Sequence, residues 1–105
     1  MTKLEELYEL LSDKDRWTHG AFARNEAWEE VDENSPTAVQ WCLLGAKYKL
    51  NLTYKEAIYL YDARDRLYGS HIILTYLNDG LGYEAVMNVI REAIKLEKEN
   101  NANVA

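Results

Sequence analysis

Cysteine is almost missing from this sequence, since Cys42 is the only one among 105 residues. A single cysteine excludes a disulfide within the chain and a cluster of thiolate ligands around a metal ion. Only two histidines are present, and they do not have the His-x-x-x-His spacing of a zinc site, so we expect neither a metal nor another cofactor. A reducing cytoplasm is the natural setting for such a chain.

Long apolar runs are missing too, and so is a basic segment at the start of the chain. Residues 1–6 lack the positive stretch and the apolar core of a signal peptide. No apolar run approaches the roughly eighteen residues that a membrane-spanning helix needs. We therefore expect a protein that is neither exported by a signal peptide nor embedded in a membrane.

Positive charge is sparse as well, because 12 Lys and Arg stand against 18 Asp and Glu, which gives a net charge of -6. The cations are scattered among the acids, so no basic face could neutralise a row of phosphates, and nucleic-acid binding is disfavoured. No glycine-rich loop that could hold a phosphate is present either. An acidic surface favours solubility first, and it also suits a basic protein partner.

Apolar residues, by contrast, are plentiful, with 48% hydrophobic and 11% aromatic residues. Burying a Trp, Leu or Phe side chain stabilises a fold by roughly 1.5–3 kcal/mol, so this chain can form a core without a disulfide or a metal. We expect one domain over residues 1–98 and a polar tail over residues 99–105 that frays.

The spacing of the apolar residues predicts an all-α fold, a compact orthogonal bundle of about five helices. Thr2 with Glu5, and Thr53 with Glu56, have the spacing of a capping box, so each pair predicts a helix start. Ser35, which precedes the only proline, predicts a third start as an N-cap. The predicted helices cover about residues 2–12, 36–49, 54–68, 71–77 and 83–98.

The second predicted helix has an unusual centre. Its segment from Ala38 to Ala46 is apolar on nearly every face, which predicts a central helix packed on several sides. Gly45 within it would allow a neighbour to approach closely. The fourth predicted helix, residues 71–77, is a short apolar run that could instead be a buried strand, because such runs do not distinguish the two.

Helical periodicity disappears between residues 13 and 34, which predicts a long ordered loop that could hold a short hairpin. Connections of this length in a small domain are commonly functional. Trp17, Thr18, His19 and Arg24 could surround a planar or anionic ligand there, since indole and guanidinium faces can clamp such molecules. The plainer interpretation is that the loop aromatics fold onto the core while the arginines pair with acids downstream.

Two further candidates for chemistry are weaker. Cys42 could act as a nucleophile with His19 or His71 as its base, but a cysteine inside an apolar helix is usually an inert hydrophobe. Asn78 and Asp79 lie in a turn between two predicted helices, where they could orient a ligand or cap the last helix. We predict no catalytic residue, and enzymatic activity is the less favoured interpretation.

Tyrosine is concentrated in one stretch, since six of the eight tyrosines lie within residues 54–83. Tyrosine is enriched at protein interfaces. Tyr59, Leu60 and Leu67 fall off the main apolar stripe of the third predicted helix, so this helix could bury a second face against another chain. Together with Trp28 they are our candidate interface residues, and a homo-oligomer is the prediction.

Three motifs of the chain resemble those of an uncharacterised domain family of small bacterial and phage proteins. In that family Trp-Thr-x-Gly-Ala-x-Ala-Arg is followed by Ser-Pro-x-Ala-Val-x-Trp-Cys-Leu-Leu-Gly-Ala and then by Trp-Asn-Asp. Here the motifs read Trp17–Arg24, Ser35–Ala46 and Leu77–Asp79. The resemblance spans most of residues 1–98.

The chain departs from this family at Leu77, where the family has tryptophan, and in the acidic segment from Glu26 to Glu33. The resemblance implies a helical domain of bacterial or phage origin with no assigned activity. It also suggests that eight residues lie together, with the loop and the turn packed beside the second predicted helix. These residues are Trp17, Thr18, Gly20, Arg24, Trp41, Cys42, Asn78 and Asp79.

These observations favour a small non-enzymatic protein-interaction or host-modulating factor, with another protein or a second copy of itself as the partner. If the chain is phage-encoded, the cytoplasm is that of the host. The alternative is a small-molecule or nucleotide-binding domain that uses the Trp17–Arg24 loop and the Asn78–Asp79 turn. A hydrolase that uses Asp79 or His19 is a minor third hypothesis.

Overall fold

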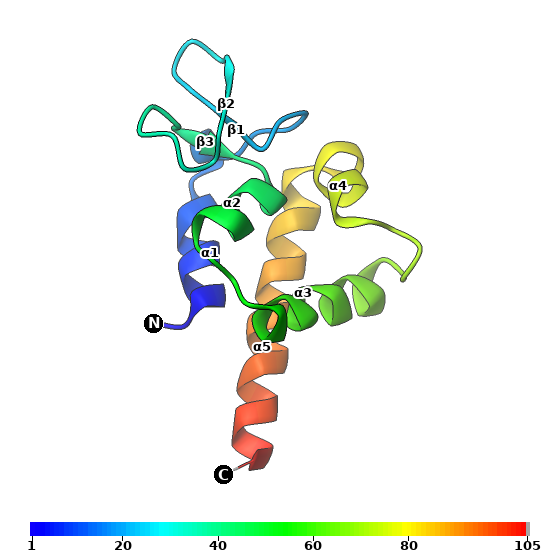
Figure 1. The fold of residues 1–105 in the computed structure, drawn as a ribbon. Helices are drawn as coiled ribbons and strands as arrows, with labels where there is room; N and C mark the ends of the chain where they lie inside the picture. Colours follow the sequence, from blue (N-terminus) through cyan, green and yellow to red (C-terminus); the bar gives the residue numbers. More distant parts are fainter. Residues whose placement is uncertain (105) are drawn as a thin grey trace.

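The computed structural model describes residues 1–104, and over that range five α-helices carry a small sheet at one end (Figure 1). A 3-10 turn, η1, follows the first helix, and a π-helical turn, η2, precedes the last. In chain order the elements are α1 (Lys3–Ser12), η1 (Lys14–Arg16), β1 (Ala23–Arg24), β2 (Glu30–Val31), β3 (Gln40–Trp41), α2 (Leu43–Lys49), α3 (Tyr54–Leu67), α4 (Leu74–Tyr76), η2 (Leu77–Leu81) and α5 (Tyr83–Val104).

Helices α1 and α3 begin where the sequence predicts, because each starts on a capping box. The Thr2 hydroxyl accepts from the Glu5 backbone N–H at 3.2 Å, and the Glu5 carboxylate accepts from the Thr2 N–H at 2.9 Å. Thr53 and Glu56 repeat this arrangement at 3.4 and 2.8 Å. The caps satisfy backbone donors that have no partner inside the helix.

The core is built around α5, which α1 and α3 both contact (Figure 1). Residues of α5 spaced three or four apart are buried and face the other helices, which confirms the predicted helix over residues 83–98. The fully buried leucines of α1 pack into the same core. The largest buried members of these two helices are Leu4, Leu7, Leu11, Val86, Val89 and Ile90.

Helix α5 is longer than the sequence predicts, since it continues past residue 98 to Val104. The expected polar tail is thus helical over residues 99–104, and Ala105 lies outside the described residues. Over residues 1–104 no helix has an apolar stretch long enough to cross a bilayer.

The prediction of a helix over residues 36–49 is wrong for its first half, because α2 begins only at Leu43. Gln40 and Trp41 form β3 instead, and the extended chain around them bonds to β1, with the Cys42 N–H donating to the Phe22 carbonyl at 3.1 Å. Ser35 ends up in a turn, where its hydroxyl accepts from a backbone N–H at 3.2 Å. An apolar run of this kind is compatible with a buried strand, and strand pairing overrides the local helix signal.

The fold is therefore not purely all-α, because it contains a three-stranded antiparallel sheet in the order β2-β1-β3. In this register Ala23 of β1 lies opposite Val31 of β2 and Trp41 of β3. The short hairpin that we expected between residues 13 and 34 is confirmed as β1 and β2.

The region around the fourth predicted helix is helical but shifted. Helix α4 covers only Leu74–Tyr76, and the predicted turn at residues 78–82 is a π-helical turn that ends at Gly82. Gly82 has a φ of 93°, a left-handed conformation that glycine adopts without strain. Asn78 and Asp79 consequently lie on a turn of helix, which points their side chains toward the sheet end of the molecule.

Gly45 of α2 lies directly against the backbone of the loop before β1. A methyl group at this position would lie 1.9 Å from the Phe22 carbonyl oxygen, far inside any normal contact. The close approach that the sequence suggested for this glycine is confirmed, although the neighbour is a loop rather than a helix.

Replacing Gly45 with alanine should lower the free energy of unfolding by about 1–3 kcal/mol, because the methyl group must displace backbone. Helix propensity alone predicts the opposite sign, since alanine is better than glycine by about 1 kcal/mol in a helix. Urea unfolding followed by circular dichroism measures the difference. Lys55→Ala, at an exposed position of α3, is the control and should change stability by less than about 0.5 kcal/mol.

Candidate functional site

The side-chain amide of Asn78 joins three segments that are far apart in the sequence. Its Oδ1 accepts from the Trp17 indole N–H at 2.8 Å and from the Leu43 backbone N–H at 3.0 Å. Its Nδ2 donates to the Thr18 carbonyl at 3.1 Å and to the Asp79 carboxylate at 2.8 Å. Asn78 is only 2% exposed, so these bonds fix the loop and the start of α2 against η2.

Asp79 and the backbone of β3 complete this junction. The Asp79 carboxylate accepts from the Gly20 N–H at 3.2 Å, and the Trp41 carbonyl accepts from the Thr18 N–H at 3.1 Å. The structure thus brings together Trp17, Thr18, Asn78 and Asp79, which the sequence proposed as a ligand site. Most of their polar atoms, however, are bonded to one another.

Arg24 is also occupied within the loop. Its Nε donates to the Thr18 hydroxyl at 3.1 Å, its Nη1 to the Trp28 carbonyl at 3.0 Å and its Nη2 to the His19 carbonyl at 3.2 Å. The guanidinium also lies 3.9 Å from the centre of the Trp28 ring. Arg24 therefore holds the loop in shape and does not reach out to clamp an anionic ligand.

Neither loop arginine pairs with the downstream acids, contrary to the plainer interpretation of the sequence. Arg16 closes the end of α1 instead, since its guanidinium donates to the carbonyls of Leu10 at 2.6 Å and Glu9 at 2.7 Å. Its ion pair is with Asp13, which precedes it, at 3.7 Å. Backbone carbonyls at the end of a helix attract cations, which explains this choice of partner.

Cys42 is the N-cap of α2 rather than a residue inside a helix. Its sulfur accepts from the Gly45 N–H at 3.2 Å, so its partner is a backbone amide and not an imidazole. Burial raises the pKa of the Cys42 thiol above its ordinary value of 9.0. His19 is exposed, and the centre of its ring lies 5.8 Å from the centre of the Trp17 ring and 6.1 Å from that of Trp28. This arrangement does not activate a nucleophile.

A cavity of about 430 Å³ opens beside the Asn78 junction. Its walls come from the loop before β1, the segment 30–33 that includes β2, the start of α2, and the α4–η2 turn. Phe22, Val31 and Leu44 make part of the wall apolar. Four acidic residues, Glu30, Asp32, Glu33 and Asp79, also line the cavity.

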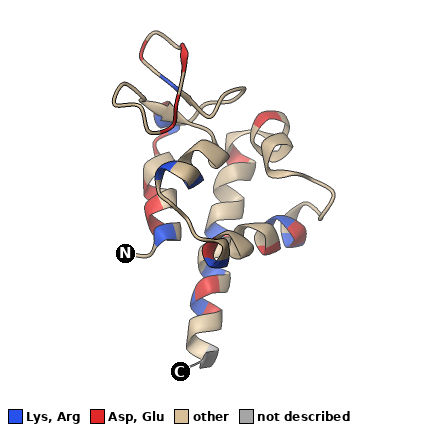
Figure 2. Cartoon of the chain, viewed as in Figure 1, with Lys and Arg blue, Asp and Glu red and all other residues tan. Residues whose placement is uncertain are grey.

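These four carboxylates make the cavity strongly acidic. Among the described residues, none of the four forms an ion pair. Arg24 is the only Lys or Arg between residues 17 and 46, against five Asp and Glu, and it is already bonded within the loop. Figure 2 shows the acidic segment of the hairpin at the end of the molecule that carries the sheet. Several acidic residues around one cavity favour the approach of a cation.

The acids do not converge tightly enough for a metal. Over residues 1–104, no group of three or more His, Cys, Asp or Glu side chains is placed to hold a metal ion. An extended organic cation fits the spread of the carboxylates better than a compact ion does, because a long cationic side chain can also lie along apolar walls.

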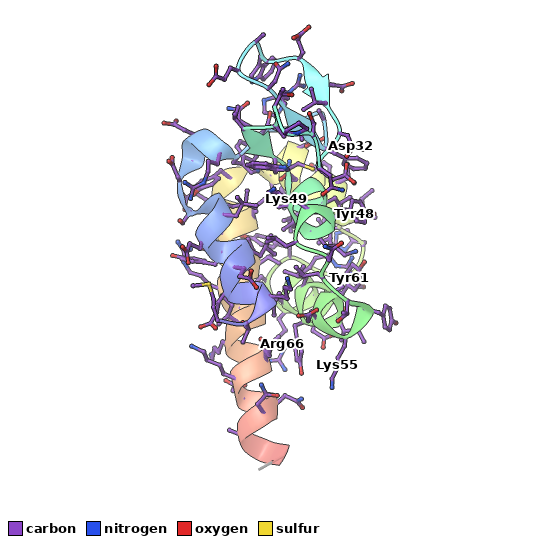
Figure 3. The ribbon with its side chains drawn as sticks, turned by 60° about the vertical axis from the view of Figure 1, so that its left-hand side comes forward. Asp32, Tyr48, Lys49, Lys55, Tyr61 and Arg66 are labelled. Atoms are coloured by element: carbon purple, nitrogen blue, oxygen red, sulfur yellow. The ribbon has the colours of Figure 1, made fainter. Side chains whose placement is uncertain are left out.

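An aromatic surface continues from the cavity along one side of the molecule. The rings of Phe22 and Tyr48 meet edge to face at 5.7 Å, and Lys47 lies 5.8 Å from the ring of Tyr61. In Figure 3, Asp32, Tyr48 and Tyr61 follow one another down this side. Both Phe22 and Tyr48 are about half exposed. A bound partner could therefore find apolar contacts next to the acidic cavity.

The candidate interface residues are scattered and do not form one surface. Leu60 is fully buried, so its assignment to an interface is wrong. The buried stripe of α3 contains Ala57, Leu60 and Ala63, whose small alanines hide the spacing in the sequence. Tyr59 is partly buried, and its hydroxyl accepts from the Asn100 amide at 2.9 Å.

The other two candidates are open to solvent. Leu67 is 43% exposed near the end of α3, and Trp28 is 53% exposed at the tip of the β1–β2 hairpin. The sequence analysis noted the charge of the acid-rich segment but did not predict its residues as part of a site. The cavity residues Glu30, Asp32 and Glu33 were therefore missed, although a cluster of acids in an aperiodic loop could have indicated them.

Comparisons with protein-family models, curated proteins and solved structures find no match for this chain. The resemblance of its three motifs to a bacterial and phage family thus stays a prediction.

Replacing Asn78 with alanine should lower the free energy of unfolding by about 3–5 kcal/mol. The Leu43 N–H, the Trp17 indole N–H and the Thr18 carbonyl would all lose a buried partner, and each orphaned group costs about 1–3 kcal/mol. Denaturant unfolding followed by tryptophan fluorescence measures the loss. Asn88→Ala on the exposed side of α5 is the control, and an equal effect of the two variants would refute the role of the Asn78 junction.

The raised pKa of Cys42 predicts a loss of stability at alkaline pH. A raised pKa means that the fold stabilises the neutral thiol, so its contribution is present below pH 9 and is lost as the pH rises through the raised value. Cys42→Ser keeps an acceptor for the Gly45 N–H but does not titrate. Between about pH 8 and about pH 10 the variant should lose less stability than the wild type, because all tyrosines titrate equally in both proteins.

Equal losses in the two proteins would contradict this assignment. Alkylation by iodoacetamide at neutral pH offers a second measurement, and Cys42 should react much more slowly than a free cysteine because the thiolate is the reactive form.

Proposed function

We propose that this chain is a small non-enzymatic protein-binding domain whose acidic cavity receives a basic side chain of a partner protein. The observation that carries the proposal is the cavity of about 430 Å³, which is lined by apolar residues and by four acidic residues that form no ion pair among the described residues. We further propose a cytoplasmic setting and a bacterial or phage origin, and these rest on the single cysteine and the motif resemblance.

An arginine of the partner suits this cavity best. Its aliphatic stem can lie on Phe22, Val31 and Leu44, while its guanidinium meets the carboxylates. Arginine binds carboxylates through two parallel hydrogen bonds, and it loses less hydration energy than lysine does when it is buried. Lysine would enter the same cavity with fewer directed bonds.

The positions and hydrogen bonds of the side chains that the sequence suggested for catalysis support a non-enzymatic role. Asp79 bonds to Gly20 and Asn78, Cys42 caps α2, and His19 does not line the cavity. Acid–base or nucleophilic catalysis needs such groups free to contact a substrate. The hydrolase hypothesis therefore has little support.

A small organic cation is the second candidate ligand, because a cavity of about 430 Å³ is within the usual size of small-molecule sites. A nucleotide is less suitable, since its phosphates would face four carboxylates. The open aromatic surface next to the cavity favours a protein partner over a free small molecule, because it extends the contact beyond the cavity.

Selection of random twelve-residue peptides on phage should yield sequences rich in Arg with apolar neighbours. The double variant Glu30→Gln/Glu33→Gln should bind the selected peptides at least about tenfold more weakly, because it removes two of the cavity's charges. Neither carboxylate forms a hydrogen bond among the described residues, so the fold should survive. Isothermal titration calorimetry at low and high salt measures both the affinity and its ionic-strength dependence.

Glu84→Gln/Glu99→Gln is the matched control, since it removes two exposed acids from α5 and should leave affinity unchanged. Selected peptides without basic residues, or an unaffected cavity variant, would refute the proposal. Thermal-shift assays with spermidine and arginine amide test the second candidate. A rise in melting temperature without any selected peptide would favour the small cation.

A further inference from the structure

The hairpin above the cavity places a large aromatic residue where glycine is usual. Between β1 and β2 the Trp28 N–H donates to the Asn25 carbonyl at 2.9 Å, and the Asn25 N–H donates to the Glu29 carbonyl at 3.0 Å. Trp28 follows this turn with a φ of 65°, in the left-handed region. Hairpins of this kind favour glycine there, because a Cβ atom crowds the following carbonyl.

The turn tolerates tryptophan because Asn25 holds it in place. The Asn25 side chain accepts from the Glu29 N–H at 3.0 Å and donates to the Glu29 carboxylate at 3.0 Å. The backbone of this turn would therefore form at least as easily with glycine at position 28. The left-handed conformation does not call for tryptophan, and an unusual conformation of this kind points to a role in recognition.

The indole is held rigidly on one side and is open on the other. The Arg24 guanidinium stacks on the ring at 3.9 Å and is itself bonded to three groups of the loop. The His19 ring packs edge to face with the indole, with the two ring centres 6.1 Å apart. Even so, Trp28 is 53% exposed. A rigid, half-exposed tryptophan loses little entropy on binding, which is the property of residues that dominate protein interfaces.

The surroundings of Trp28 specify the charge of the partner. Glu26 and Glu29 flank it in the turn, and Glu30, which follows in β2, lines the acidic cavity. Glu30 also lies opposite Arg24, the residue that stacks on the indole. Acidic residues thus continue from the tryptophan along β2 into the cavity lining, and charge complementarity favours a basic partner.

We infer that Trp28 is the anchor by which this domain binds a basic protein partner: the indole enters an apolar pocket of that partner while the acidic cavity receives a basic side chain. This inference rests on the proposed function and adds the residue that supplies most of the affinity. The strained hairpin positions the anchor, and the stacked Arg24 guanidinium fixes the orientation of the indole.

Trp28→Gly tests the inference, because glycine relieves the left-handed strain while it removes the Arg24 stack, so the melting temperature should change by less than about 5 °C. The basic peptides selected on the wild type should bind this variant at least about tenfold more weakly. Binding should also shift the tryptophan emission of the wild type to shorter wavelength, and this shift should be absent in the variant. Calorimetry and fluorescence with the synthetic peptides measure both effects.

Tyr54→Ala is the matched control, since Tyr54 is a 78% exposed aromatic at the start of α3 and its loss should leave peptide affinity unchanged. Trp28→Asn is a second variant, because asparagine also tolerates the left-handed conformation. If both Trp28 variants bind the peptides as tightly as the wild type, the anchor is refuted while the proposed function stands. A melting temperature that falls by more than about 5 °C in both would make Trp28 a residue of the scaffold and would also refute the anchor.

If the wild type selects no basic peptide, the proposed function fails first, and the anchor fails with it. Tenfold weaker binding with an unchanged melting temperature supports the inference, because a purely structural tryptophan would not separate the two readouts.

Discussion

The side-chain amide of Asn78 is the interaction on which the sheet end of this molecule depends. Its Oδ1 accepts two hydrogen bonds and its Nδ2 donates two, and the partners come from the loop, α2 and η2. Asp and Ser cannot supply both halves of this arrangement, and at 2% exposure no water is available to replace a lost partner. The amide also accounts for the start of α2, since it bonds the first backbone N–H of that helix.

This junction changes which residues are free for binding. Trp17, Arg24 and Asn78 look like ligand-binding residues, but their polar atoms bond to one another and to the backbone. Once they are bonded, the polar groups left around the cavity are mainly carboxylates. A set of residues that suggested an anionic or planar ligand thereby builds a site that suits a cation.

The domain consequently divides its tasks between two parts. The helices around α5 bury most of the large apolar side chains and supply stability. The small sheet and its hairpin carry the exposed tryptophan and the acidic cavity residues that we propose for binding, although Ala23 and Trp41 of the sheet also belong to the core. Recognition by loops on a rigid scaffold is a common arrangement because loop positions contribute little to the core.

The sequence by itself determined the features that depend on neighbours a few residues apart, namely the capping boxes at Thr2 and Thr53 and the last helix, and it left a hairpin in the loop as one possibility. Tertiary structure decided the rest. The run before Leu43 became a strand because β1 lay beside it, and Leu60 was buried because α5 covers the stripe between two alanines. Residues 17 and 78 became partners through folding, and hydrogen bonds between such distant positions leave no periodic signal in a single sequence.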